Sequence, residues 1–165
     1  MTHMVATAKT PTGPAFTVVL VCHVASVLLA LVAAVAGIVA ATMALRARGE
    51  LASWVRSYFS PGVNWGGRVL YLVPVFGAAL LVMSGGAYRL GDTWVEAGLG
   101  LWAAAALLAE ALLWPAERRV QRALAGWGGP GVPVAARASC RTMCISASGV
   151  VLLMVAAMVV MTAKP

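Results

Sequence analysis

Four long apolar stretches dominate this sequence and limit what the chain can fold into. A helix needs about 20 mostly apolar residues to cross about 30 Å of hydrocarbon. Backbone groups in lipid have no water to bond, so each stretch must be helical or belong to a closed barrel. Barrel strands are about 9–11 residues long and alternate in polarity, which these stretches do not. We therefore predict an all-α, polytopic membrane protein with four transmembrane helices in a bundle, over Phe16–Leu45, Val69–Tyr88, Thr93–Trp114 and Thr142–Met161.

The composition agrees with lipid as the solvent of this chain. Apolar residues make up 62% of the sequence and charged residues 10%, whereas soluble domains carry about 25% charged residues. Such a chain cannot cover a surface that faces water. We expect a flexible tail over residues 1–15, where Pro11 and Pro14 lie, and one four-helix transmembrane domain over residues 16–165.

The basic residues indicate how the chain is oriented. The net charge is +7, but the basic residues lie at the ends of the apolar stretches and form no separate domain, so nucleic acid is not an expected partner. Nine arginines fall in the first and third connections, and three basic residues fall in the tails and the second connection. Cytoplasmic loops are enriched in Lys and Arg. We expect both long connections inside the cell and both termini outside.

The connections contain local signals of their own. The first one repeats apolar residues at Leu51, Trp54, Val55 and Tyr58, a pattern typical of a short interfacial amphipathic helix. The second apolar stretch contains Pro74, which removes a backbone donor and can bend a helix. We expect Pro115 to end the third helix, and the long connection 115–141 to contain a glycine-rich loop around residues 126–131.

His23 and Glu110 are the ionisable residues inside the apolar stretches that attract a functional interpretation. Intramembrane ionisable groups are functional candidates by default, and His can bind haem or a metal, or relay protons. The alternative for His23 is a neutral ring hydrogen-bonded to a neighbouring helix. Glu110 lies near the end of its helix, where it can pair with Arg118, Arg119 or an arginine of the first connection, or serve as an interface anchor.

The sulfur-containing residues give weaker signals. Cys140 and Cys144 lie one helical turn apart, so both thiols share a face, but a metal site needs more than two ligands. Small apolar packing residues are the alternative. Met154, Met158 and Met161 form a stripe that can bind Cu(I) or fill a core. The sequence contains no nucleotide-binding loop, catalytic triad or zinc-protease motif, so we do not expect an enzyme.

The order of several features resembles a known family. A histidine near the start of the first helix precedes an arginine-bearing connection, a second helix with Pro and Gly, a Gly-Asp-x-Trp turn and a closing Lys-Pro: His23, Arg46, Arg48, Pro74, Gly77, Leu90–Trp94 and Met161–Pro165. This order resembles the bacterial integral membrane proteins grouped as domain of unknown function 2269, over residues 17–165. That family has no settled activity, so the resemblance implies an architecture and a bacterial plasma membrane location.

More distantly, the plan is similar to four-helix haem-synthesis membrane proteins of the protoporphyrinogen oxidase type and to copper-resistance membrane proteins. In the oxidase type, a first-helix His and a Lys near the chain end matter for function, and the matching residues here are His23 and Lys164. That resemblance implies haem as a cofactor. This chain departs from the pattern, because no Trp-x-Gly follows His23 and the third helix has no second His.

Three functions follow as hypotheses. The first is a structural or accessory subunit of a larger membrane complex, with the bilayer and other membrane proteins as partners. It fits the small residues spaced four apart, such as Ala33 and Gly37, which allow helices to approach closely. The second is a haem- or porphyrin-binding redox protein that uses His23. The third is a copper permease that uses His23 and the methionine stripe.

Overall fold

A computed structural model of the chain describes residues 13–163, and every regular element in that range is helical. Four of the helical segments are long and apolar enough to cross a membrane: Pro14–Arg46, Trp65–Met83, Thr93–Leu124 and Val134–Ala163. The all-α, four-helix architecture expected from the apolar stretches is therefore confirmed. The elements are α1 (Pro14–Arg46), α2 (Ser53–Tyr58), α3 (Trp65–Arg68), η1 (Val69–Tyr71), α4 (Leu72–Met83), α5 (Thr93–Leu108), η2 (Ala109–Leu113), α6 (Trp114–Leu124) and α7 (Val134–Ala163).

The helices begin and end at somewhat different residues from those expected. α1 starts at Pro14, inside the range predicted as a tail, because proline is well tolerated in the first turn of a helix. The rest of that predicted tail, residues 1–12, lies outside the described residues. The second span starts at Trp65 and ends at Met83, so it lies several residues before the predicted stretch.

The third helix does not end at Pro115, and this prediction was wrong. Pro115 lies at the start of α6, which continues the helix to Leu124. Proline cannot donate to the carbonyl four residues earlier and its ring crowds that carbonyl. The π-helical segment η2 comes directly before it, with the Trp114 N–H bonded to the Ala109 carbonyl, and this wider turn lets the helix pass the proline.

The fourth helix also extends further than expected. It begins at Val134, so the connection from the third helix is only residues 125–133 rather than 115–141. The glycine-rich part of that connection is non-helical, as predicted. Gly131 has a φ of +60° and donates its N–H to the Gly49 carbonyl at 2.6 Å, so the first and third connections touch each other.

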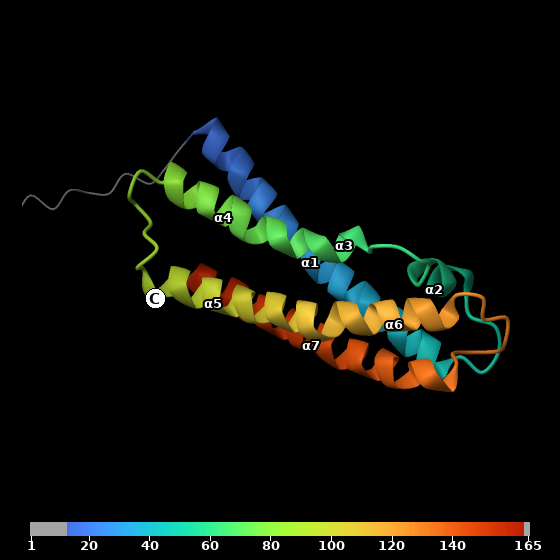
Figure 1. The fold of residues 1–165 in the computed structure, drawn as a ribbon. Coiled ribbons are helices and arrows are strands. Elements are labelled where there is room, and N and C mark those ends of the chain that lie inside the picture. Colours follow the sequence, from blue (N-terminus) through green and yellow to red (C-terminus); the bar gives the residue numbers. More distant parts are fainter. Residues whose placement is uncertain (1–12, 164–165) are drawn as a thin grey trace, which may run out of the picture.

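Three helices reach beyond the second span. The 19 residues from Trp65 to Met83 cover about 28 Å, whereas the 33 residues of α1 cover about 50 Å, at 1.5 Å per residue. Figure 1 shows the excess at one end, where α1, α6 and the start of α7 run past α3 and meet α2. We call this part, residues 37–60 and 114–143, the extension.

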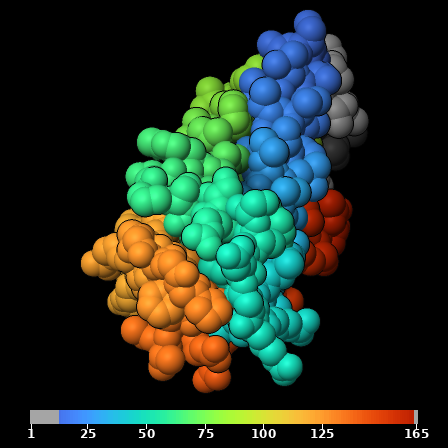
Figure 2. All heavy atoms as spheres, turned by 90° about the vertical axis from the view of Figure 1, so that its right-hand side faces the viewer, coloured from blue at the N-terminus to red at the C-terminus, as the bar shows by residue number. Residues whose placement is uncertain are grey.

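The first connection covers one side of the extension. Seen from that end in Figure 2, its atoms lie between α1 and the segment that contains α6. α2 is the short amphipathic helix expected in this connection, and it buries Val55. Leu51 and Phe59, on either side of α2, are also buried, whereas Trp54 is exposed. The apolar face of the connection therefore packs on the bundle.

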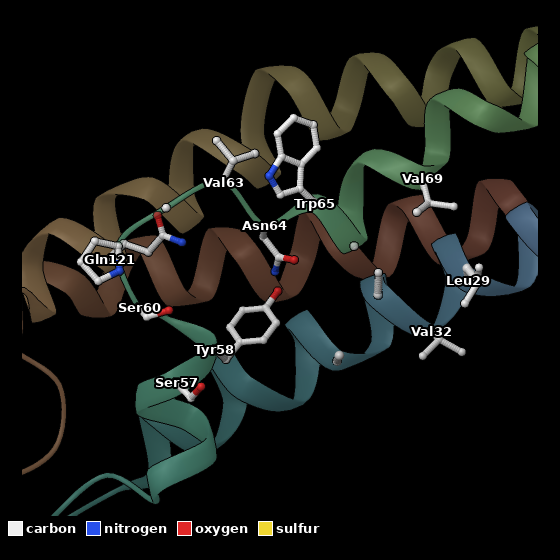
Figure 3. A pocket seen from close by; sticks show the side chains of 15 residues that line it. Leu29, Val32, Ser57, Tyr58, Ser60, Val63, Asn64, Trp65, Val69 and Gln121 are labelled. Carbon is white, nitrogen blue, oxygen red and sulfur yellow. The ribbon is translucent and has the colours of Figure 1, made fainter.

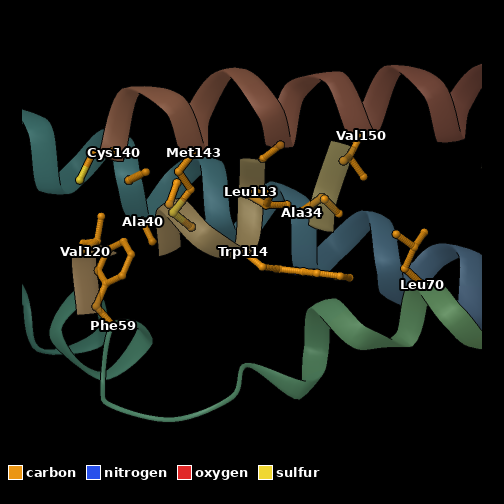
Figure 4. Packing of buried hydrophobic residues seen from close by; sticks show 14 of the residues in the cluster. Ala34, Ala40, Phe59, Leu70, Leu113, Trp114, Val120, Cys140, Met143 and Val150 are labelled. Carbon is orange, nitrogen blue, oxygen red and sulfur yellow. The ribbon is translucent and has the colours of Figure 1, made fainter. Parts of the chain in front are cut away.

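The best-packed core of the described chain lies in the extension. Phe59 and Val120 lie side by side there, with Cys140 and Met143 of α7 opposite (Figure 4), and all four are at most 2% exposed. Ala40 and Ala41 are fully buried, and a Cβ at Gly37 would lie 3.0 Å from the Tyr58 hydroxyl oxygen. The small residues of α1 thus permit close packing within the bundle itself.

Candidate functional site

Pro74 leaves one backbone carbonyl of the second span without its helical donor, and Trp102 donates a hydrogen bond to that carbonyl. A proline has no N–H, so the carbonyl four residues before it, that of Leu70, loses its normal helical donor. The indole Nε1–H of Trp102 on α5 donates to that oxygen at 3.0 Å. Because an unsatisfied carbonyl inside a membrane is costly, this bond both satisfies the backbone and ties the second span to the third.

His23 lies against the same helix, one turn further along. Its Nδ1 is 3.0 Å from the Val73 carbonyl oxygen, and since a carbonyl only accepts, Nδ1 carries the proton. A Cβ at Gly77 would lie 3.4 Å from the His23 ring, so glycine at position 77 makes room for it. This geometry supplies the hydrogen bond to a neighbouring helix that was the alternative considered for His23, and Nε2 is the ring nitrogen that does not contact Val73.

Lys164, the second residue that the distant resemblance implied, lies outside the described residues. A joint role of His23 and Lys164 therefore stays a prediction. Within residues 13–163 no three His, Cys, Asp or Glu side chains gather as metal ligands.

Glu110 pairs with an arginine of the first connection, one of the partners considered for it. Arg68 Nη1 lies 3.2 Å from Glu110 Oε1, and the Tyr71 hydroxyl donates to the same oxygen. The Arg68 guanidinium lies 3.7 Å from the centre of the Trp114 ring, an attractive cation–π arrangement. These four side chains join the second span to the third helix at the level where the extension begins.

A second carboxylate, Glu117, lies deeper in the same region and was not expected there. It is only 6% exposed, and the Asn64 Nδ2 donates to its Oε1 at 3.0 Å. The Tyr58 hydroxyl lies near this carboxylate. Glu117 sits on α6, whereas Asn64 and Tyr58 come from the first connection, so this small polar cluster holds the connection against the bundle.

Tyr58 is kept in its donor form by its surroundings. Burial of the side chain, and next the negative Glu117 carboxylate beside it, raise the pKa of Tyr58 above its ordinary value of 10. Both effects disfavour the phenolate, because it would be a second anion with little solvent. The hydroxyl thus stays protonated at neutral pH.

A pocket of about 530 Å³ opens beside this polar cluster. In Figure 3 the Tyr58 hydroxyl points toward the Asn64 amide, with Ser60 and Gln121 toward one end of the view and Leu29 and Val32 toward the other. The polar side chains thus lie toward the end formed by the first connection, which Val63 also lines. The apolar side chains at the other end come from the spanning part of α1. The lining residues are residues 29, 32, 33, 36, 57, 58, 60–66, 69 and 121.

A smaller hollow of about 30 Å³ lies next to the pocket and shares Ala33, Tyr58 and Asn64 with it. Glu117 and Trp114 line this inner hollow. It has room for one or two water molecules, at about 10–15 Å³ each. Tyr58, Asn64 and Ala33 thus line both the open pocket and the hollow that Glu117 lines.

The cysteine and methionine side chains named above pack between helices and do not gather around one point. Cys140 is buried, and the Cys144 thiol lies 3.5 Å from the Thr42 hydroxyl and 3.9 Å from the Ile38 carbonyl of α1. Met154 is buried, and Met161 lies directly against Gly98 of α5. Both groups therefore occupy helix–helix contacts, the packing alternative considered for each.

Sequence reasoning missed Glu117, Asn64 and Tyr58 as one cluster because it ended the third helix at Pro115. One signal was present: Trp114, Glu117, Val120 and Gln121 recur at helical spacing, and all four are buried. Proline is common in the first turn of a helix, so this pattern was compatible with a helix that starts at Trp114. The pairing of Asn64 with Glu117 has no sequence signal, since 53 residues separate them.

Comparison of the chain with protein-family models, curated proteins and solved structures finds no match. The resemblance to domain of unknown function 2269 and the more distant likenesses therefore stay predictions. The fold and the apolar helices define the class, a multi-pass membrane protein.

Proposed function

We propose that this chain is an accessory subunit of a larger complex in the bacterial plasma membrane, and that its extension docks on an acidic cytoplasmic surface of a partner. In this arrangement both termini lie outside the cell. The observation that carries the proposal is the charge of the extension. Its exposed charged residues are eight arginines and one acid: Arg46, Arg48, Arg56, Arg118, Arg119, Arg122, Arg137, Arg141 and Glu50.

The contrast with the opposite end supports both the docking face and the orientation. At that end the described charged residues are Arg89, Asp92 and Glu96, which nearly cancel. Arginine-rich segments are retained on the cytoplasmic side. A concentrated positive surface also steers an acidic partner and rejects basic ones.

The polar side chains within the bundle support a structural role as well. Trp102, His23 and Glu117 each bond a group on another segment of this chain. Among the described residues, every fully buried side-chain nitrogen and oxygen has a hydrogen-bond partner. The polar groups are thus used to join the helices of a scaffold.

Purification in mild detergent tests this proposal. We expect the tagged chain to retain a partner in a fixed ratio. Replacing Arg119, Arg137 and Arg141 by Gln should lower the retained fraction about tenfold, because each exposed ion pair contributes about 0.5 kcal/mol. The matched control is Arg89→Gln, which removes an exposed arginine from the opposite end.

Two outcomes would contradict docking through the extension. One is a chain that elutes alone as a monomer in mild detergent. The other is partner retention that is equal for the triple Gln variant and for wild type at low salt, where exposed ion pairs are strongest.

A second candidate function, haem or porphyrin binding by His23, is favoured by one observation. Ligating histidines usually donate their other ring N–H to a carbonyl, which orients the ring, and the His23 Nδ1–H does so toward Val73. The absorbance spectrum of the same eluate tests it: a haem protein shows a Soret band, and His23→Ala should abolish that band. A colourless eluate contradicts this candidate and leaves the accessory proposal standing.

A further inference from the structure

The pocket beside the Glu117 cluster is divided into an apolar and a polar half at the depth where a head group lies. Leu29, Val32 and Val69 belong to the membrane-spanning helices, and Leu29 and Val32 are exposed. Ser57, Ser60 and the Asn64 amide belong to the first connection, beyond the start of the second span. The volume of about 530 Å³ lies within the usual range for ligand pockets.

The position of Trp65 agrees with this depth. It opens the second span, lines the pocket and is 75% exposed. Tryptophan is enriched at membrane interfaces, where its ring lies at head-group level. The pocket therefore straddles the boundary between hydrocarbon and head groups.

The polar half is built to accept hydrogen bonds from a cation. No Lys or Arg lines the pocket. The Asn64 amide nitrogen donates to Glu117, and the Asn64 carbonyl oxygen remains as an acceptor on the pocket wall. The hydrogen bond to the Glu117 carboxylate polarises the Asn64 amide and makes this oxygen a stronger acceptor. A Cβ at Gly66 would lie 3.3 Å from this Asn64 oxygen, so glycine keeps the approach to it open.

We propose that this pocket binds the head group of a phospholipid with a primary ammonium, with the ammonium on Asn64 and Tyr58 and an acyl chain along Leu29 and Val32. The hydroxyls of Ser57 and Ser60 supply donors for the phosphate. This proposal is independent of the docking partner, because it rests on the pocket and not on the arginine surface.

Native mass spectrometry of the purified full-length protein tests the proposal. The protein is mixed in detergent with equal amounts of dioleoyl phosphatidylethanolamine, phosphatidylcholine and phosphatidylglycerol. Ethanolamine and choline head groups carry the same charge, but only ethanolamine has N–H donors. We expect the ethanolamine lipid to be retained about tenfold over choline, the size of one charge-assisted hydrogen bond. Glu117→Gln should bring the two lipids close to parity.

A pocket-filling variant keeps the test independent of Glu117. Ala36 lines the pocket, and Ala36→Leu should lower retention of the ethanolamine lipid severalfold. The matched control is Ala25→Leu, a half-buried alanine of the same helix outside the pocket lining. Equal or better retention of choline or glycerol lipid, or an Ala36→Leu variant that binds like Ala25→Leu, would overturn the proposal.

Discussion

At the scale of single residues, polar groups inside the bundle receive hydrogen bonds from side chains of other segments. Trp102 donates to the Leu70 carbonyl that Pro74 leaves without a helical donor. Asn64 donates to the buried Glu117 carboxylate. Both hydrogen bonds join segments far apart in the sequence, so these residues help to set which helices are neighbours.

The Trp102 bond gives a residue-scale prediction. Trp102→Phe removes the donor and should lower the free energy of unfolding by about 1–2 kcal/mol, because the Leu70 carbonyl is left unsatisfied. Pro74→Ala in the same background restores a backbone N–H four residues from Leu70 and should recover part of this loss. Thermal unfolding of wild type, Trp102→Phe and the double variant in one detergent measures both effects. Equal unfolding temperatures for wild type and Trp102→Phe would refute the role assigned to Trp102.

At the scale of elements, the helices follow different packing rules in their two halves. In the spanning part large apolar side chains point outward, as do Val82 (83% exposed) and Leu107 (71% exposed), because lipid solvates them. In the extension, Val55 of α2 and Phe59 directly after it are buried. The first connection therefore adds large apolar side chains to the core of the extension.

This contrast gives an element-scale prediction. Phe59→Ala leaves a cavity in the extension core and should lower the free energy of unfolding by about 3–4 kcal/mol. Val82→Ala removes a side chain that faces outward from the second span, and it should change stability by no more than about 0.5 kcal/mol. Chemical denaturation in a fixed detergent compares the two. A cost for Val82→Ala as large as that for Phe59→Ala would show that Val82 is packed against protein.

At the scale of the whole molecule, the end at which three helices run past the second span is also the end that carries most of the exposed charge. Three helices run past the short second span at one end (Figure 1), and that end carries the eight exposed arginines. A long helix that leaves the hydrocarbon must be solvated by water or head groups, and arginines provide that solvation. Because cytoplasmic segments are enriched in Arg and Lys, we expect this end to lie in the cytoplasm.

Orientation gives the prediction for the whole molecule. Tags at residues 1 and 165 should be accessible to an impermeant label in intact cells, whereas a cysteine placed at exposed Gly128 should react only after permeabilisation. A cysteine-free background avoids reaction at the native thiols. Termini that stay protected in intact cells would overturn the proposed orientation.

The sequence by itself determined that lipid is the solvent of this chain and that its architecture is a bundle of four transmembrane helices. Apolar stretches of this length have to be helices in lipid, and composition alone located all four, although the third helix ends ten residues later than expected and the fourth begins eight residues earlier. It also located Pro74, His23 and Glu110 as polar interruptions of those helices. These inferences succeed because each depends on local composition and on the cost of burying backbone groups.

Only the tertiary structure decided which polar groups meet. The helix continues past Pro115 because a π-helical turn precedes it, and this continuation carries Glu117 to Asn64 and Tyr58. The tautomer of His23 depends on a carbonyl 50 residues away. Such contacts depend on how the helices pack, and in a chain whose outward side chains are also apolar the pattern of apolar residues does not show which helix faces meet.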